Sequence, residues 1–116
     1  YGKAALEVME ALSLFESLRR NLVQGENISQ VYQFVFTGNA ELGFVAQSQI
    51  PHTGDLGIGS SWVIPAALHS PIKQDVVLLS RAKDNVAARE FMSFLSLPSS
   101  QAVIRSYGYE SGGSPR

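Results

Sequence analysis

The sequence predicts an α/β fold with a mainly parallel sheet. Amphipathic segments with helical spacing alternate with short apolar runs along the chain. The run DVVLL at 75–79 is apolar after its first residue, which is typical of a strand covered on both faces. A turn at Gly25 joins a short apolar segment to an amphipathic helix. In such sheets, ligands bind at the carboxyl ends of strands, beside helix starts.

The first quarter of the chain predicts two helices and a strand. A helix from Lys3 to about Leu12 would place apolar side chains on one face at helical spacing, namely Ala5, Leu6, Met9 and Leu12. Ser13 is a candidate cap for a short second helix that ends near Arg20, where basic residues suit the helix dipole. Residues 21–24 are apolar at their centre and are predicted to form a strand.

The segment GENISQVYQFVFTGNAELGFVAQSQI, residues 25–50, predicts a capped helix followed by a buried strand. Asn27 is a good N-cap, and Gly38 has the position of a C′ glycine. Between them, one apolar stripe has helical spacing: Ile28, Val31, Tyr32 and Val35. The strand is expected at 41–46, where Gly43 would allow another backbone segment to approach closely.

The middle of the chain predicts loops and two further strands. Residues 51–59 combine proline, histidine, threonine and glycines, so a loop is expected there. Residues 61–64 are predicted as a strand that ends at Pro65, and 65–71 as irregular. The run at 75–79 would be the last strand.

The last part of the chain predicts two helices. Asp84 or Asn85 would cap the first, which is expected to bury Val86, Phe91, Phe94 and Leu95. Pro98 is expected to break the chain. Ser99 or Ser100 would then cap a final helix that carries Ala102, Val103 and Ile104 and ends before Gly108.

Composition excludes several classes of function. The chain has 116 residues, enough for one domain with a core, and 45% of them are apolar. A net charge of −1 gives no electrostatic case for binding nucleic acid or an anionic membrane surface. No apolar run approaches the length of a membrane span, and the absence of cysteine excludes disulfides and thiolate metal sites.

The two ends of the chain suggest an internal segment of a longer protein. The sequence begins YGKAALE, without an initiator methionine or a signal peptide, and starts almost within a helix. The tail SGGSPR at 111–116 is expected to be disordered.

The helix start at Asn27-Ile28-Ser29 is the strongest candidate for a binding site. The first N–H groups of a helix lack partners, and the helix dipole favours an anion there. Most such ends are satisfied by water or by their own cap, so the residues alone leave this open. No lysine or arginine lies between Val23 and Ser48, so neutral donors would hold the anion.

No other group of residues indicates catalysis or a cofactor. His52 and His69 are far apart in sequence and lack nearby carboxylates, so surface positions are favoured over metal binding. The glycines of 57–61 precede a predicted strand, not a helix, which argues against a phosphate loop. Trp62 is interpreted as a core residue. The sequence therefore predicts a protein that is not an enzyme and has no cofactor.

Four segments together resemble the periplasmic molybdate-binding proteins of bacterial molybdate ABC importers. They are YGKAALEVMEALSLFESL, GENISQVYQFVFTGNAELGFVAQSQI, SSWVIPAALHSPIKQDVVLL and AAREFMSFLSLPSSQAVIRSYGYE. The resemblance runs in order to about Glu110 and covers only the C-terminal half of such a protein.

The resemblance implies a type II periplasmic-binding-protein fold, with two α/β lobes joined by crossover strands. Residues 1–70 would belong to the second lobe, and 71–110 would supply the returning crossover strand and the C-terminal helices of the first lobe. Molybdate or tungstate would lie between the lobes, held by hydrogen bonds from neutral groups. The direct ligands of the metal would all be oxyanion oxygens, so the protein would bind no metal directly.

The resemblance also assigns site residues. Tyr1 falls where some members have a tyrosine whose hydroxyl donates to the oxyanion. Ile28 falls where members use the backbone N–H of a valine or isoleucine. Ala46 falls where another branch places a binding tyrosine, and this departure favours Tyr1 as the hydroxyl donor.

The implied function is capture of molybdate or tungstate outside the cytoplasm, in the periplasm, and delivery to an ABC permease. The alternative is an oxyanion-sensing effector domain of a bacterial transcription regulator, because some regulators share this fold. A chain that holds only part of a core could also form a homodimer to cover its apolar surfaces.

Overall fold

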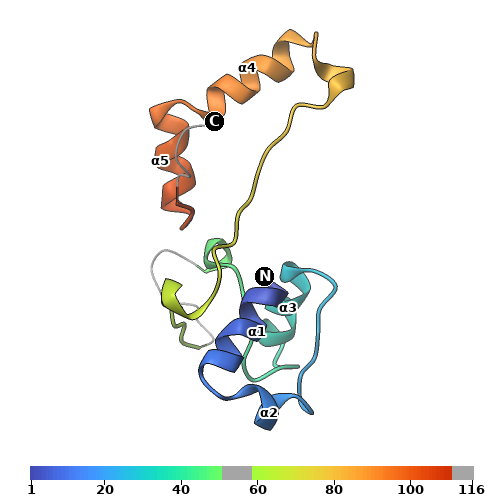
Figure 1. The fold of residues 1–116 in the computed structure, drawn as a ribbon, viewed down its shortest axis with the longest axis vertical. Coiled ribbons are helices and arrows are strands. Elements are labelled where there is room, and N and C mark those ends of the chain that lie inside the picture. The colour runs from blue at the N-terminus through green and yellow to red at the C-terminus, as the bar shows by residue number, and fades with distance from the viewer. Residues whose placement is uncertain (51–58, 111–116) are drawn as a thin grey trace. The chain divides into compact units, whose positions relative to one another are not determined.

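The computed structural model describes residues 1–50 and 59–110. In that part of the chain, the regular elements are all helical (Figure 1). The α-helices are α1 (Gly2–Ala11), α2 (Phe15–Leu18), α3 (Ile28–Phe36), α4 (Val86–Leu95) and α5 (Pro98–Ser106). The short 3-10 helices are η1 (Gln47–Gln49), η2 (Ala66–Leu68) and η3 (Ser80–Ala82).

The chain divides into two compact units, Tyr1–Lys73 and Gln74–Arg116. In the first unit, α1 contacts α2 and η2. In the second, α4 contacts α5. The buried apolar residues among those described are Val8, Met9 and Ala46, all in the first unit. The apolar core of the described residues is therefore small and lies in the first unit.

The predicted strands are not present in the described residues. Residues 21–24, 41–46, 61–64 and 75–79 are outside any regular element. The run at 75–79 is largely exposed, with Val77 75% exposed. A strand exists only through hydrogen bonds to a neighbouring strand, and none of these segments pairs with another described segment. The parallel sheet of the predicted α/β fold is therefore not seen in this part of the chain.

The first predicted helix is confirmed as α1, but the predicted cap of the second is wrong. Leu14, not Ser13, is the N-cap of α2, and the helix ends at Leu18. Ser13 instead has a φ of 57°, in the left-handed region that allows the sharp turn between the two helices. The Ser13 N–H donates to the Glu10 carbonyl oxygen at 2.9 Å, which closes the end of α1.

Helix α3 begins and ends as the sequence predicts. Asn27 is its N-cap, and Gly38 follows its end with a φ of 74°. The predicted apolar stripe is half-buried. Gly43 passes so close to this helix that an added Cβ would lie 2.6 Å from Val35 Cγ2 and 3.3 Å from Val31 Cγ1. The expected close approach at Gly43 is confirmed, although the approaching segment is not a strand.

The second unit confirms both predicted helices and corrects two details. Asn85 caps α4, but Val86, Phe91 and Phe94 are each more than half exposed, so the expected burial is wrong for these three. The main contact of α4 among the described elements is with α5. In α5 the N-cap is Leu97, because Pro98 begins this helix at its first position, where a missing N–H costs nothing. The expected serine caps are therefore wrong.

Candidate functional site

The start of α3 is held by two linked hydrogen bonds. The Asn27 side chain accepts from the Gln30 N–H at 2.9 Å. The Gln30 side chain accepts from the Glu26 N–H at 2.6 Å, one residue before the N-cap. The first bond satisfies the N–H of the third helical residue, and the second fixes the direction in which the chain enters the helix.

Two backbone donors remain at this helix start. Within the described part of the chain, neither the Ile28 N–H nor the Ser29 N–H donates to another group. Their dipoles point along the helix axis toward its start, where the helix carries partial positive charge. Ile28, predicted as a backbone donor, therefore lies where such a donor can act, and Ser29 adds a second one.

A side chain from another segment supports this helix start. Gln49 donates from Nε2 to the Ile28 carbonyl oxygen at 3.4 Å. Its Oε1 accepts from the Ala46 N–H at 3.0 Å. Gln49 thus links Ile28 with Ala46, two positions that the sequence analysis singled out. Ala46 is only 5% exposed and carries no polar side-chain group to offer.

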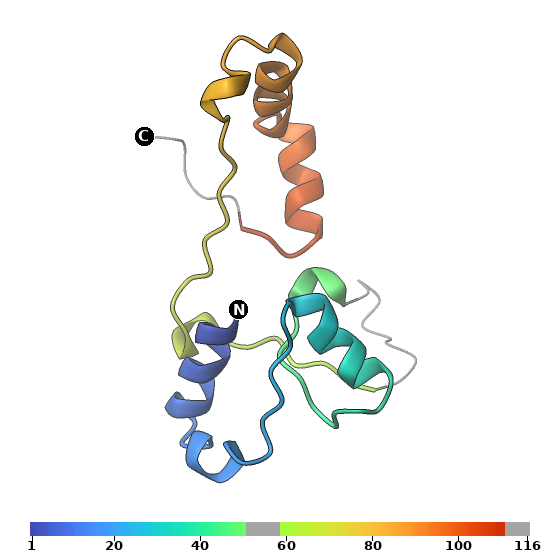
Figure 2. The same cartoon turned by 90° about the vertical axis from the view of Figure 1, so that its right-hand side faces the viewer.

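The second predicted donor, Tyr1, lies at the start of α1. It is the N-cap residue of that helix, its side chain is partly exposed, and its carbonyl oxygen accepts from the Ala5 N–H at 3.0 Å. In both views of the ribbon, the N-terminal end of the chain lies beside the beginning of α3 (Figures 1 and 2). The structure therefore brings the starts of two helices, and the segments of both predicted donors, to one end of the first unit.

The segment that forms the start of α3 offers an anion neither a lysine or arginine side chain nor a metal-binding cluster. No lysine or arginine lies between Val23 and Ser48 in the sequence. The described residues contain no cluster of three or more histidine or carboxylate side chains able to hold a metal ion. The described helices are also too short or too polar to cross a bilayer. The chemistry available at the start of α3 is hydrogen-bond donation from neutral groups.

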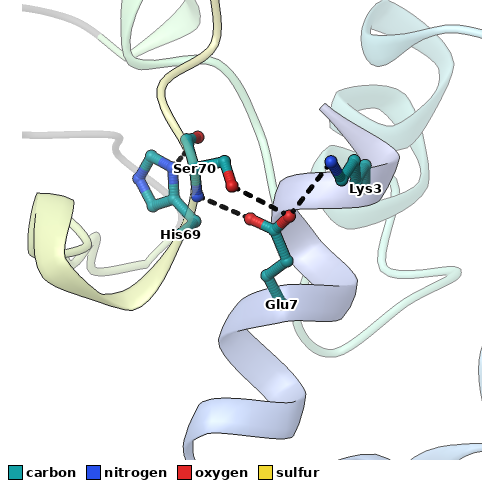
Figure 3. A network of polar contacts seen from close by, with 4 residues as sticks. All are labelled: Lys3, Glu7, His69 and Ser70. Atoms are coloured by element: carbon teal, nitrogen blue, oxygen red, sulfur yellow. Dashed lines mark hydrogen bonds and ion pairs between the residues drawn. The ribbon is translucent and has the colours of Figure 1, made fainter.

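A second polar network joins α1 to the end of the first unit (Figure 3). The Glu7 carboxylate accepts from the Ser70 N–H at 2.5 Å and from the Ser70 hydroxyl at 3.1 Å. The Lys3 Nζ lies 3.5 Å from Oε1 of the same carboxylate. These contacts, led by the Ser70 backbone hydrogen bond, lower the pKa of Glu7 below its ordinary value of 4.5. The contact joins residues 63 positions apart, so local sequence patterns do not reveal it.

The remaining candidates lie outside the site or outside the described residues. His69 Nδ1 lies 2.8 Å from the Ser70 carbonyl oxygen, a local contact. Trp62 is 62% exposed, so its assignment to a core is wrong for the described part of the chain. His52, the glycine at 57 and the tail at 111–116 fall outside the described residues.

Sequence reasoning missed Gln30 and Gln49. Gln30 could have been found, because glutamine three positions after a cap residue often reaches back to the backbone at the helix start, although here it bonds Glu26 and not the cap itself. Gln49 gave no such signal, because its contact with Ile28 spans 21 positions of the chain.

Comparison with known proteins places the chain in a family. The family model for bacterial extracellular solute-binding proteins matches residues 1–110. The chain belongs to this family. Membership supports a periplasmic-binding-protein-like fold, while the strands of such a fold are not seen in the described residues.

Two relatives carry the name molybdate-binding protein ModA, so the resemblance noted in the sequence is confirmed. The relative from Azotobacter vinelandii is 49% identical over 109 residues, which cover 94% of this chain and 43% of that protein. The relative from Rhodobacter capsulatus is 50% identical over 109 residues and 42% of its length. A putative ABC transporter substrate-binding lipoprotein, YvgL, from Bacillus subtilis (strain 168) is 28% identical over the same span. The chain thus spans about two fifths of the length of these relatives.

Proposed function

We propose that this chain contributes to an extracytoplasmic receptor that captures molybdate or tungstate for ABC-type import. The observation that carries the proposal is the start of α3, where two backbone N–H groups have no partner among the described residues and the segment has no lysine or arginine. Relatives named for molybdate binding share about half of their aligned residues with it. An oxyanion fits such a site because its oxygens accept from several N–H and O–H donors at once.

The roles of individual residues follow from their position. The Ile28 N–H donates to one oxygen of the anion, and the Ser29 N–H lies in the same turn of helix. The Tyr1 hydroxyl would reach the anion from the start of α1. A neutral site suits a dianion that must be released again, because the anion is held without forming an ion pair. The ligand is therefore bound whole, as an oxyanion, and nothing in the proposal requires a chemical step.

The wider assignments belong to the same proposal. The first unit would correspond to most of one lobe of the receptor, and α4 and α5 to the returning helices of the other. An ABC permease would receive the anion, and the receptor would act in the periplasm. Self-association would cover exposed apolar side chains such as Phe91 and Phe94. Sedimentation across a range of protein concentrations would test that last point.

The expected affinity can be bounded from the number of donors. A hydrogen bond to a charged group contributes about 1.5–3 kcal/mol, so Tyr1, Ile28 and Ser29 together give roughly 4.5–9 kcal/mol. Association itself costs several kcal/mol. Because a millimolar dissociation constant already needs about 4 kcal/mol net, affinity in the millimolar range is what these three donors support.

Calorimetric titration of this chain with molybdate tests the proposal, with tungstate and sulfate as comparison anions. We expect molybdate and tungstate to bind alike, with dissociation constants in the millimolar range. The absence of any molybdate binding would overturn the proposed function for this chain. A sub-micromolar dissociation constant would instead show that more donors contribute than the three named.

A further inference from the structure

Both polar atoms of the Gln49 side chain form hydrogen bonds with the backbone. One bond is at the start of η1, and the other is in the first turn of α3. Oε1 accepts from the Ala46 N–H at 3.0 Å, and Nε2 donates to the Ile28 carbonyl oxygen at 3.4 Å. The side chain is partly buried, as are both contacts. It therefore connects η1 with the first turn of α3, two segments that are distant in sequence.

The hydrogen bond from Gln49 to the Ile28 carbonyl oxygen affects the Ser29 N–H, one of the two proposed backbone donors. That carbonyl belongs to the same peptide group as the Ser29 N–H. A donor placed on the carbonyl oxygen polarises the peptide group and strengthens its N–H as a donor. It also holds the plane of that peptide, and hence the direction of the Ser29 N–H. The Asn27 side chain holds the N–H of Gln30, the residue after Ser29, so this cap and the Gln49 contact together hold the first turn.

A carboxamide is suited to this position because it can accept and donate without a charge. A glutamate would accept from the Ala46 N–H but could not donate to the Ile28 carbonyl, and its negative charge would repel a bound anion. A lysine would donate but could not accept. The contact also occupies the Ala46 N–H, which removes this buried group from the set of possible anion donors.

From these contacts we propose that Gln49 is a positioning residue of the anion site, acting through the Ile28–Ser29 peptide and without touching the ligand. The inference rests on the proposed function for the identity of the anion. It adds to that function a neutral side chain that aligns and strengthens the backbone donors at the start of α3.

The test compares Gln49→Met with Gln47→Met. Methionine has nearly the length of glutamine and makes neither hydrogen bond. Gln47 lies on the same short helix, is exposed, and makes no side-chain hydrogen bond within the described residues. Three quantities are measured for each variant: the molybdate dissociation constant, the melting temperature and the ligand-free amide proton shift of Ser29.

We expect Gln49→Met to weaken molybdate binding by about threefold to tenfold, the loss typical of one hydrogen bond. The Ser29 amide proton should move upfield, while amides in the last turn of α3 and the melting temperature stay as in Gln47→Met. A purely structural role would lower the melting temperature and shift amides along the whole helix. Unchanged binding by Gln49→Met, with normal binding by the wild type, would overturn the positioning role and leave the proposed function intact.

A second pair of variants keeps the test decisive if Gln49→Met loses its fold. Gln49→Glu retains the acceptor for the Ala46 N–H, loses the donor and adds a negative charge, and Gln47→Glu controls for that charge. Weaker binding by Gln49→Glu than by Gln47→Glu is expected, and equal binding contradicts the proposal. If the wild type binds no molybdate at all, the positioning role fails together with the proposed function.

Discussion

Helices α3 and α4 begin with the same cap and yet differ in what surrounds it. Asn27 accepts from the Gln30 N–H at 2.9 Å, and Asn85 accepts from the Ala88 N–H at 3.1 Å. At α3 the cap is reinforced by the Gln30 side chain and by Gln49 from another segment. At α4 the described residues place no such support, and a cationic residue, Lys83, precedes the helix. A cap alone is therefore common, whereas a supported helix start in a segment without lysine or arginine is the feature proposed to bind an anion.

The comparison is tested most strongly by removing one N–H from each helix. Ile28 and Val86 both occupy the first helical position, where proline is tolerated and its missing N–H costs the helix nothing. Asn27 is already extended, with φ −152° and ψ 168°, as a residue before proline requires. We expect Ile28→Pro to weaken molybdate binding tenfold or more, the loss of about one hydrogen bond to a charged group. Calorimetric titration measures it.

Two controls accompany that variant. Ile28→Val keeps the N–H and should bind as the wild type does, since only the backbone is used. Val86→Pro removes the equivalent N–H of α4 and should also leave binding unchanged. Equal binding by Ile28→Pro and the wild type would show that the Ile28 N–H is not a donor to the anion.

The close passage at Gly43 is the second feature that sets α3 apart. Gly43→Ala would place a Cβ 2.6 Å from Val35 Cγ2, so the helix or the passing segment must shift. We expect a loss of about 1–3 kcal/mol in the free energy of unfolding, the usual cost of overpacking. Urea denaturation measures it. Gly2→Ala is the matched control, because nothing lies within 4 Å of a Cβ there. Equal stability of the two variants would contradict the described packing.

Removing the asparagine caps is expected to have a smaller effect on stability, and its effect on molybdate binding should differ between α3 and α4. Asn27→Ala and Asn85→Ala should each lower the free energy of unfolding by about 1 kcal/mol, because each leaves one N–H without its acceptor. Only Asn27→Ala should also weaken molybdate binding. If both variants weakened it equally, the effect would come from general loss of stability and not from the α3 site.

The contact between Glu7 and Ser70 provides the smallest prediction. As Gln49 does at the start of α3, the Glu7 side chain binds a backbone group of a segment distant in sequence, in this case the Ser70 N–H. Because the folded-state pKa of Glu7 is lowered, the contact stabilises the fold above pH 4.5 and loses its effect as the pH falls through the folded value. Glu7→Gln should therefore flatten the dependence of stability on pH in the acid range.

Glu10→Gln is the control for this prediction. Glu10 lies on the same helix, is exposed, and its side chain has no partner within the described residues. Thermal melts between neutral and acid pH measure both variants. If the stability of Glu7→Gln depended on pH as steeply as that of Glu10→Gln, the described contact would contribute nothing in solution.

The sequence predicted the features of this chain that are local. Asn27, Gly38 and Asn85 were identified because a cap depends on its own few neighbours. The strand predictions failed for the described residues because a strand depends on partners elsewhere, and an apolar run such as 75–79 does not by itself reveal them. The proline at the start of α5 was taken for a break, although the same residue is favoured at the first helical position.

The candidate site also combines features that depend on neighbours in sequence with features that depend on distant segments. Ile28 was assigned from a resemblance, and its free N–H follows from local helix geometry. Gln49 could not have been assigned, because its role depends on how η1 lies against α3. Tyr1 remains a prediction, since its assignment rests on the resemblance and on the position of the N-terminal end.

The most direct test of the account is an amide proton–nitrogen NMR spectrum of this chain titrated with molybdate. We expect the Ile28 and Ser29 amides to shift progressively and to saturate in the millimolar range. The Val86 and Ala87 amides, at the equivalent positions of α4, should stay in place. If all four amides moved together, or if the α3 pair remained still while molybdate bound elsewhere, the start of α3 would not be the anion site.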